Sequence, residues 1–537
     1  MTALVEFARE SARLYLQSIV FVDDEIYSQS SPRIDSQAYV GKIPAFPSPF
    51  KSSQVESPAA NNIVLEDPQR IYHPKQLVES FAKEGIVCAL YEPAIGFSAE
   101  RESELYRLCE RADAIILDWD LYQEGGENIT PLIANLVDQS QGAMPHHVRL
   151  CVIYTATPDL YRVGNKVYDK LVERKLQVDV SQEGAVLIAG ATRICIFGKP
   201  DVVGRTDKAK ALEVRESDLA TKVIDEFAKM HTGILPSIAL RGLASIRRNS
   251  RRILDKFSHV LDGPFLLHRA MVAEDEEAFD QVSELIAEEA LAVMDEDEVS
   301  KEEMDRITSE VSKSLNLKSV TFEPVEGKGP FASGAAAERY LIGGWAAISS
   351  DFRRPRKGIP FDSFHAAMGC NETYAEKQLA ALFSVRTKYK ATPPRLGFGC
   401  VLRLEDGAFA FCLMPACDSI RLSVKTSFPF WRLKEIGGAG SRGMVVQTDD
   451  GKYRDLYAEG KPRDMFWMDS FVASNLGVIA ADKVGERYFF AGEKHRLEWV
   501  ASLKPEHAQR IAHDIGLKFS RVGLVEAEWL RLKSNKD

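Results

Sequence analysis

The amino-acid sequence predicts an α/β protein in which a doubly wound parallel sheet of five strands is followed by a helical connector and a C-terminal α+β domain. The run AIIL at residues 114–117 is short and wholly apolar, as is typical of a strand buried on both faces, and acidic residues follow it. Similar runs alternate along the chain with amphipathic stretches of helical length, the order that produces parallel strands joined by helices. Later, alternating apolar residues on either side of Asp406-Gly407 predict an antiparallel hairpin.

Five strands and several helices are predicted for the N-terminal part. The strands are expected at residues 18–25, 86–91, 114–121, 149–155 and 193–200. The helices are expected at residues 3–17, 73–84, 98–111, 128–137, 158–174 and around 219–227. The apolar piece AVLIAG, between residues 175 and 191, is a candidate for an extra strand.

The predicted strands end in residues that can carry chemistry. Asp23 and Asp24 close the first strand, Asp118 the third, Thr155 the fourth and Lys199 the fifth. Because ligands of an open α/β sheet bind at the carboxyl ends of its strands, these side chains are expected to meet at one edge. Clustered carboxylates repel one another unless a hard cation shares the site, and Mg²⁺ takes oxygen ligands of this kind. A cation beside a lysine and a threonine suits the transfer of a phosphoryl group onto a carboxylate.

The order of these residues resembles the receiver domain of two-component response regulators. That family has an acidic pair after its first strand, a phosphoacceptor aspartate after the third, Thr-Ala or Ser-Ala after the fourth and Lys-Pro after the fifth. This chain has, in the same order, Asp23-Asp24, Asp118, Thr155-Ala156 and Lys199-Pro200. No single motif is specific, but four in the right order favour the resemblance over an α/β domain with merely solvated charges. The resemblance implies a flavodoxin-like strand order of 2-1-3-4-5.

The resemblance also implies a phosphoacceptor and a metal site. Asp118 would accept the phosphoryl group from a phosphohistidine of a partner histidine kinase. Mg²⁺, the one cofactor implied, would be held by Asp118, by one or both of Asp23 and Asp24, and by the main-chain carbonyl of Asp120.

Two further residues would respond to the phosphate. Lys199 would pair with Asp118 and then with a phosphate oxygen, while the Thr155 hydroxyl would turn in to bond another oxygen. Members of the family usually carry an aromatic residue three positions before the lysine, and this residue moves with the threonine. This chain has Ile196 there, so the sequence leaves open how the site would communicate with the outer face.

Composition indicates a globular chain of the cytoplasm. A net charge of -10 and a pI near 5.7 argue against general nucleic-acid binding. The eight cysteines are scattered, several of them inside apolar strands, as is typical of reduced thiols. No signal peptide is evident and no apolar run is long enough to span a bilayer, so no membrane is expected as a partner.

We expect three regions along the chain. Residues 1–232 would form the receiver domain, with an insertion at 28–62 that is either a disordered tether or a lid over the phosphorylation site. Residues 233–318 would form a helical connector, whose basic stretch at 238–261 is expected to meet acidic residues of the same chain in preference to nucleic acid. Connector helices could pair two copies of the chain, although heptads are not sustained. Residues 319–537 would form an α+β output or interaction domain of no assigned family.

Two kinds of function fit this organisation. In the first, the chain is a signalling switch, or a phosphate sink that drains a sister response regulator. Its large unassigned C-terminal part and long insertion resemble receiver proteins of bacterial anti-phage two-component systems, so a role in anti-phage defence is one expectation. In the second, the receiver switches an effector enzyme, a hydrolase or nuclease, in the C-terminal part. The candidates for such a site, His365, Asp418 and His513, stand isolated in the sequence. We therefore expect the C-terminal part to act by contact and not by catalysis.

Overall fold

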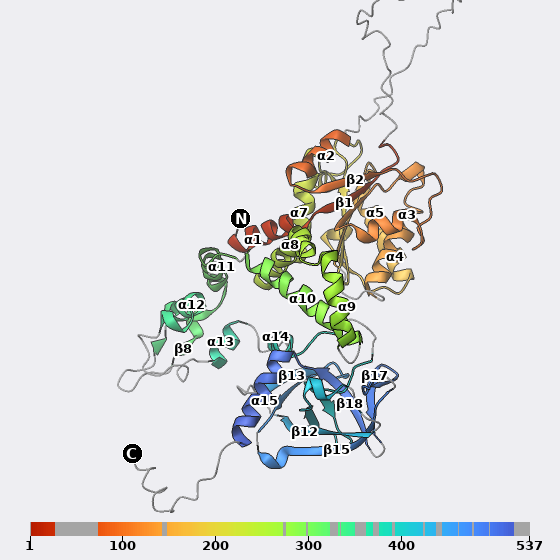
Figure 1. The fold of residues 1–537 in the computed structure, drawn as a ribbon. Coiled ribbons are helices and arrows are strands. Elements are labelled where there is room, and N and C mark those ends of the chain that lie inside the picture. The colour runs from red at the N-terminus through yellow and green to blue at the C-terminus, as the bar shows by residue number, and fades with distance from the viewer. Residues whose placement is uncertain are drawn as a thin grey trace, which may run out of the picture. The chain divides into compact units, whose positions relative to one another are not determined.

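The fold is that of a computed structural model (Figure 1). It describes residues 2–26, 74–141, 148–271, 275–296, 299–322, 331–332, 334–348, 361–368, 375–388, 393–420, 422, 425–435, 443–459, 461–474, 477–492 and 495–519. The insertion predicted at residues 28–62 lies outside the described residues. The chain divides into two compact units: Met1–Leu254 with Glu289–Val311, and Asp255–Glu288 with Ser312–Asp537.

The first unit is built on a seven-stranded sheet, so the prediction of five strands was wrong. In spatial order the strands are β2 (Val87–Tyr91), β1 (Ser18–Val22), β3 (Ala114–Leu117), β4 (Arg149–Thr155), β7 (Thr192–Gly198), β6 (Val186–Ala189) and β5 (Asp179–Ser181). The first five are parallel, in the 2-1-3-4-5 order that the family resemblance implied.

The two additional strands form a hairpin along β7. β6 pairs antiparallel with β7, and β5 pairs antiparallel with β6. The apolar piece considered as an extra strand is β6, and its Val186 and Leu187 are buried. Burial of these side chains favours a strand that covers β7 over a loop through solvent. The sequence therefore indicated β6 as a candidate, whereas β5 has three exposed residues and no apolar pattern that would predict a strand.

Alternate residues of the strands face opposite sides of this sheet. Ile115 and Leu117 lie in an apolar cluster with α3, α4 and α5, whereas Ala114 and Ile116 lie in a second cluster with α1, α2 and α7. Figure 1 shows the sheet between these two groups of helices. Their bounds are α1 (Ala3–Tyr15), α2 (Pro74–Lys83), α3 (Glu104–Arg111), α4 (Ile129–Gln141), α5 (Leu160–Glu173) and α7 (Leu219–Met230). Because helices cover both faces of the sheet, its polar side chains are found at the ends of the strands.

Helix α8 (Ile234–Asp255) is attached to the amino-terminal side of the sheet by an ion pair. Arg247 donates to both carboxylate oxygens of Asp113, at 2.8 and 3.0 Å. The same carboxylate accepts hydrogen bonds from the backbone N–H groups of Gln17 and Ser18, where β1 begins. Asp113 therefore joins the connector helix to the first strand.

Other arginines of α8 are also paired within the first unit. Arg241 donates to Glu303 of α11 (Lys301–Ser314) at 3.1 Å, and Arg252 donates to Glu296 of α10 (Asp275–Glu296) at 2.6 Å. The partners expected for the basic stretch were residues 274–277 and 295–298, and of these contacts the pair of Arg252 with Glu296 falls in those ranges, whereas Glu303 does not. Helix α9 (Asp262–Met271) lies between α8 and α10 in the sequence.

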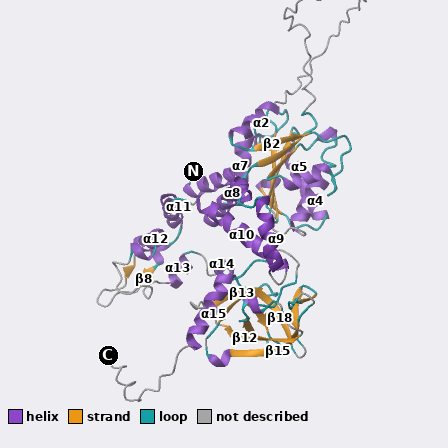
Figure 2. Ribbon diagram, viewed as in Figure 1, coloured by secondary structure: helices purple, strands orange, loops and turns teal. Residues whose placement is uncertain are grey.

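The second unit contains an antiparallel sheet with helices, in agreement with the predicted α+β class (Figure 2). β10 and β11 pair around Asp406-Gly407 as the sequence predicts. The strands run β13 (Gly443–Gln447), β14 (Tyr453–Tyr457), β12 (Lys425–Glu435), β11 (Phe409–Cys412), β10 (Cys400–Arg403), β18 (Arg496–Ser502), β17 (Arg487–Ala491) and β16 (Asp482–Val484), and β15 (Met465–Val472) also pairs with β12.

Helices and a small second sheet complete this unit. Helix α15 (Pro505–Phe519) packs Ala508 and Ile511 against the nine-stranded sheet. This unit also contains β8 (Thr321–Phe322), β9 (Phe331–Ala332), α12 (Gly334–Gly343), α13 (Phe361–Ala367) and α14 (Ala375–Ser384), together with α9 and most of α10. In the part of the chain that the structure describes, every helix is too short or too polar to cross a membrane.

Candidate functional site

Three charged side chains meet where β1, β3 and β7 end. Asp23 follows β1, Asp118 follows β3 and Lys199 follows β7, and all three are buried. Nζ of Lys199 lies 2.6 Å from Oδ2 of Asp118 and 2.8 Å from Oδ2 of Asp23. Neighbouring parallel strands end at the same edge of a sheet, and this brings residues that are far apart in the sequence into one cluster.

Asp24 completes an acidic group with Asp23 and Asp118. One ligand oxygen from each of the three carboxylates lies within 4.8 Å of the other two. Backbone groups orient two of them: the N–H of Glu25 donates to Asp23 at 2.9 Å, and the N–H of Tyr122 donates to Asp24 at 2.8 Å. Mg²⁺ is bound by a few carboxylates while it keeps several waters, so this donor set fits the predicted cofactor.

Asp120 lies next to the acidic group. Its exposed side chain accepts a hydrogen bond from the N–H of Gly125 at 2.8 Å, and its own N–H donates to Oδ1 of Asp118 at 3.2 Å. Its carbonyl oxygen, the predicted metal ligand, accepts a hydrogen bond from Gln123 at 3.1 Å. A carbonyl oxygen has two lone pairs, so this contact leaves one for a cation.

Burial and mutual contact set the charges of the cluster. Burial raises the pKa of Asp23 to about 6; Lys199 opposes this shift and Asp118 adds to it. Burial alone would lower the pKa of Lys199, but the carboxylates of Asp118 and Asp23 raise it above its ordinary value. The lysine therefore stays protonated, and its charge offsets part of the repulsion between the two buried carboxylates.

Thr155 ends β4 and is hydrogen-bonded within its own loop. Its Oγ1 lies 3.0 Å from Oγ1 of Thr157 and accepts a hydrogen bond from the N–H of Thr157 at 3.1 Å. Its carbonyl oxygen accepts a hydrogen bond from the N–H of Lys199 at 2.8 Å. All the strand-end residues predicted from the sequence therefore lie at this one edge, and the threonine hydroxyl is bonded to Thr157.

Sequence reasoning missed a buried arginine behind this edge. Arg205 donates through Nη2 to the carbonyl oxygens of Thr155 and Thr157, at 2.9 and 3.1 Å, and through Nη1 to that of Lys199. The one residue of the sequence that reflects this arginine is Gly198. A Cβ added at Gly198 would lie 2.2 Å from Nη1 of Arg205, so this position needs glycine. Nothing in the sequence identifies Arg205 as the group that this glycine admits.

Ile196 occupies the position where receiver domains usually carry an aromatic residue. It is fully buried, in the apolar cluster shared with α5. A side chain packed in this way cannot exchange between buried and exposed positions. The aromatic residue that the family resemblance would pair with the threonine is therefore replaced here by a buried aliphatic side chain.

The residues considered for a second catalytic site lie on three separate elements of the second unit. His365 is on α13, with Nε2 2.6 Å from Oε1 of Glu376. Asp418 lies in the turn Ala416–Asp418, and His513 lies on α15. Within the described ranges, one group of three or more His, Cys, Asp or Glu side chains could hold a metal, and it is the acidic group of the first unit.

A parallel sheet with an acidic group and a lysine at its strand ends is the arrangement of receiver domains. Residues 15–204 match the family described as the response receiver domain. The match supports the predicted response regulator receiver domain in this part of the chain, and it suggests a phosphoacceptor function in signalling. The matched range includes Asp23, Asp24, Asp118, Thr155 and Lys199 and ends one residue before Arg205. Searches of curated proteins and of solved structures give no match.

Proposed function

We propose that this chain is a response regulator whose Asp118 accepts a phosphoryl group from a phosphohistidine of a partner histidine kinase. The observation that carries the proposal is the contact of buried Asp118 with Lys199, at 2.6 Å, beside the Asp23-Asp24 pair. Asp118 lies at the end of a buried strand and is oriented by Lys199, and its carboxylate is placed for chemistry at the sheet edge.

In the proposed transfer, an oxygen of Asp118 attacks phosphorus. A P–O bond forms, the P–N bond to the imidazole breaks, and the imidazole leaves with the bonding electron pair and binds a proton. The product is an acyl phosphate on Asp118. Mg²⁺ held by Asp118, by one or both of Asp23 and Asp24, and by the main-chain carbonyl of Asp120 would supply positive charge for the phosphate oxygens when bound.

Lys199 and Thr155 would then exchange partners. Once phosphorylated, Asp118 has lost the charge that Lys199 contacts, so the ammonium group would bond a phosphate oxygen instead. The Thr155 hydroxyl would leave Thr157 for another phosphate oxygen and would carry its loop with it.

We also propose that the second unit acts by contact. The three residues that sequence reasoning offered for catalysis, His365, Asp418 and His513, lie on separate elements, which supports this choice. Phosphorylation would then switch a binding partner or drain phosphate from a sister regulator. The cytoplasmic setting, the role in anti-phage defence and association of two copies stay predictions.

The test uses the full-length chain with acetyl phosphate and Mg²⁺. Mass spectrometry should find one acid-labile phosphate on the wild type and none on Asp118→Asn. Asp120→Asn is the matched control, because it makes the same chemical change two residues away on an exposed side chain and keeps the main-chain carbonyl. Labelling of Asp118→Asn at the wild-type level would show that the phosphoacceptor is another residue.

A further inference from the structure

Arg205 connects three separate segments through one guanidinium group. Nη2 donates to the carbonyl oxygens of Thr155 and Thr157, in the loop after β4. Nη1 donates to the carbonyl oxygen of Lys199, after β7, and to Oε1 of Glu213 at 2.9 Å. The Arg205 side chain is fully buried, so these bonds have no competition from water.

The segment that carries Glu213 is itself tied to the end of β7. The N–H of Gly198 donates to the carbonyl of Leu212 at 3.0 Å, and the N–H of Val214 donates to the carbonyl of Gly198 at 2.9 Å. The hydroxyl of Tyr154 donates to the carbonyl of Val214 at 2.8 Å. Residues 212–214 are thus held against the same strand ends as the acidic group.

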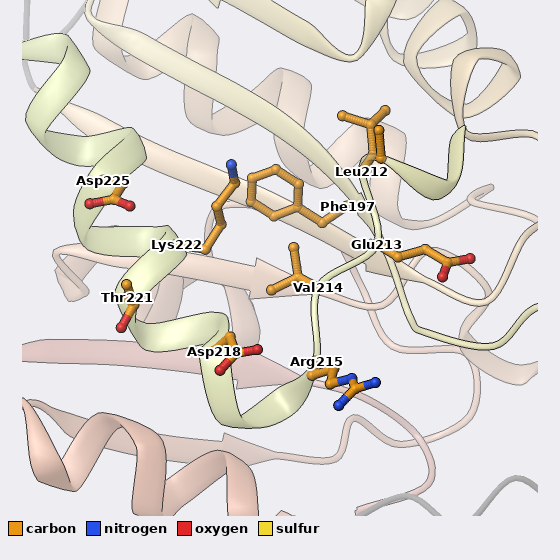
Figure 3. Close-up of a pocket in the computed structure, with 10 residues that line it drawn as sticks. Phe197, Leu212, Glu213, Val214, Arg215, Asp218, Thr221, Lys222 and Asp225 are labelled. Atoms are coloured by element: carbon orange, nitrogen blue, oxygen red, sulfur yellow. The ribbon is translucent and has the colours of Figure 1, made fainter. Parts of the chain in front are cut away.

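This segment forms one wall of a cavity of about 370 Å³ on the first unit. Figure 3 shows the cavity between residues 212–215 and helix α7, with the ring of Phe197 beside Lys222. Nζ of Lys222 lies 5.3 Å from the centroid of that ring. The carboxylate of Glu213 points away from α7 in this view, which is consistent with its ion pair to Arg205. A shift of the Arg205 guanidinium would therefore displace Glu213 and, with it, this wall of the cavity.

We propose that Arg205 is a positioning residue that couples the phosphorylation site to the wall formed by residues 212–215. The inference rests on the proposed function, in which the Thr155 hydroxyl moves toward the phosphate. Because Arg205 donates to the carbonyls of both Thr155 and Thr157, its guanidinium follows that movement, and Glu213 follows the guanidinium. This route replaces the one that buried Ile196 cannot provide.

The test follows the amide hydrogen exchange of Gly198 and Val214 in the full-length chain, with and without beryllofluoride and Mg²⁺, a mimic of the aspartyl phosphate. In the wild type, the mimic should change exchange severalfold in the loop of residues 155–157 and at Gly198 and Val214. In Arg205→Lys the change at 155–157 should persist and the change at Val214 should disappear. Lysine keeps the charge, but a single ammonium group cannot span these acceptors as a guanidinium fork does.

Two further variants keep the test decisive. Glu213→Ala removes the contact between Arg205 and the wall and keeps the bonds of Arg205 to Thr155, Thr157 and Lys199. It should also abolish the response of Val214, and it provides this test even if Arg205→Lys fails to fold. Lys208→Ala is the matched control: it removes a positive charge three residues away, on the short helix α6 (Asp207–Lys210). Lys208 is exposed and pairs with exposed Glu183, so the response should equal that of the wild type.

The two proposals can fail separately. If Asp118 of the wild type takes no label from acetyl phosphate, the proposed function is wrong. If Asp118 is labelled but Val214 responds equally in the wild type, Arg205→Lys and Glu213→Ala, the coupling role of Arg205 is wrong and the phosphoacceptor stands. A purely structural role would change the exchange of Val214 without the mimic and would leave its response to the mimic intact.

Discussion

The ammonium group of Lys199 lies 2.6 Å from Oδ2 of Asp118, and both residues are buried. The lysine also contacts Asp23 at 2.8 Å, so one ammonium group serves two buried carboxylates. A divalent cation bound to the same oxygens would share this neutralising role with the lysine.

Lys199→Ala is expected to destabilise the metal-free protein and leave phosphorylation possible. The loss of stability should be at most about 3 kcal/mol, the low end for breaking a buried ion pair, because Asp23 can take up a proton. Mg²⁺ should restore more stability to the variant than to the wild type, as measured by denaturant unfolding with and without the metal. Label should still reach Asp118, while the phosphate-dependent change in hydrogen exchange elsewhere in the chain is lost. The same exchange response in the variant as in the wild type would contradict this role.

Asp23→Asn combined with Asp24→Asn is expected to abolish labelling that depends on Mg²⁺. Amide groups are weaker ligands for a hard cation than carboxylates, and the variant loses two of the three charges of the acidic group. Labelling by acetyl phosphate across a series of Mg²⁺ concentrations measures the effect. Asp120→Asn serves as the control. Unchanged labelling at ordinary Mg²⁺ would assign some other task to the acidic pair.

Arg247→Ala should cost less stability than Asp113→Ala. Arg247→Ala removes the bidentate contact, worth about 1–3 kcal/mol, and one hydrogen bond to the carbonyl of Tyr15. Asp113→Ala removes the same bidentate contact and leaves two backbone N–H groups, where β1 begins, without their acceptor. A double-mutant cycle on the free energy of unfolding should show coupling between the two side chains. For comparison, Arg252→Ala breaks an exposed pair with Glu296 and should cost less than about 1 kcal/mol. Equal losses for Arg247→Ala and Asp113→Ala would mean that the two backbone contacts of Asp113 add no more than the single bond from Arg247 to Tyr15.

Glu226→Gln is expected to destabilise the first unit in a way that depends on pH. Burial would raise the pKa of Glu226, but hydrogen bonds from Lys229 and Arg193 lower it below its ordinary value. The charge therefore stabilises the fold above about pH 4.5, and this contribution is lost as the pH falls through the lowered pKa of the folded state.

The measurement compares the free energies of unfolding of Glu226→Gln and the wild type as the pH falls from neutral into the acid range. The difference should be about 3 kcal/mol at neutral pH, as for other broken buried pairs, and should shrink below pH 4.5. Glu173→Gln is the control, because its contact with Lys170 is largely exposed. A difference that stays constant with pH would show that the charge of Glu226 is not what stabilises this contact.

Strand β2, at the edge of the sheet, is partly exposed. Most of the parallel part of the fold could be predicted because β1, β3, β4 and β7 are buried on both faces. Such strands are unbroken apolar runs, and β3 and β4 are buried along their whole length. The hairpin was harder to predict: β5 has the sequence DVS and is exposed throughout, so no apolar pattern distinguishes it from a loop.

The predicted site residues could be found because each directly follows a strand whose position was clear. Their contacts follow from the sheet, since β1 and β7 end beside β3 and β4. Arg205, in contrast, does not directly follow a predicted strand. It reaches the site from a loop six residues beyond Lys199, and only the backbone path of that loop turns its guanidinium toward the carbonyls of Thr155 and Thr157. Sequence spacing carries no information about such a path.

The hairpin of β5 and β6 also changes how the sheet can meet other chains. Without it, the seven residues of β7 would offer a row of unpaired backbone groups, which is a template for edge-to-edge aggregation. With it, the edge on this side is β5, which has three residues and begins with Asp179. An edge this short, with a charge at its start, is a poor template for continuing the sheet into a second molecule.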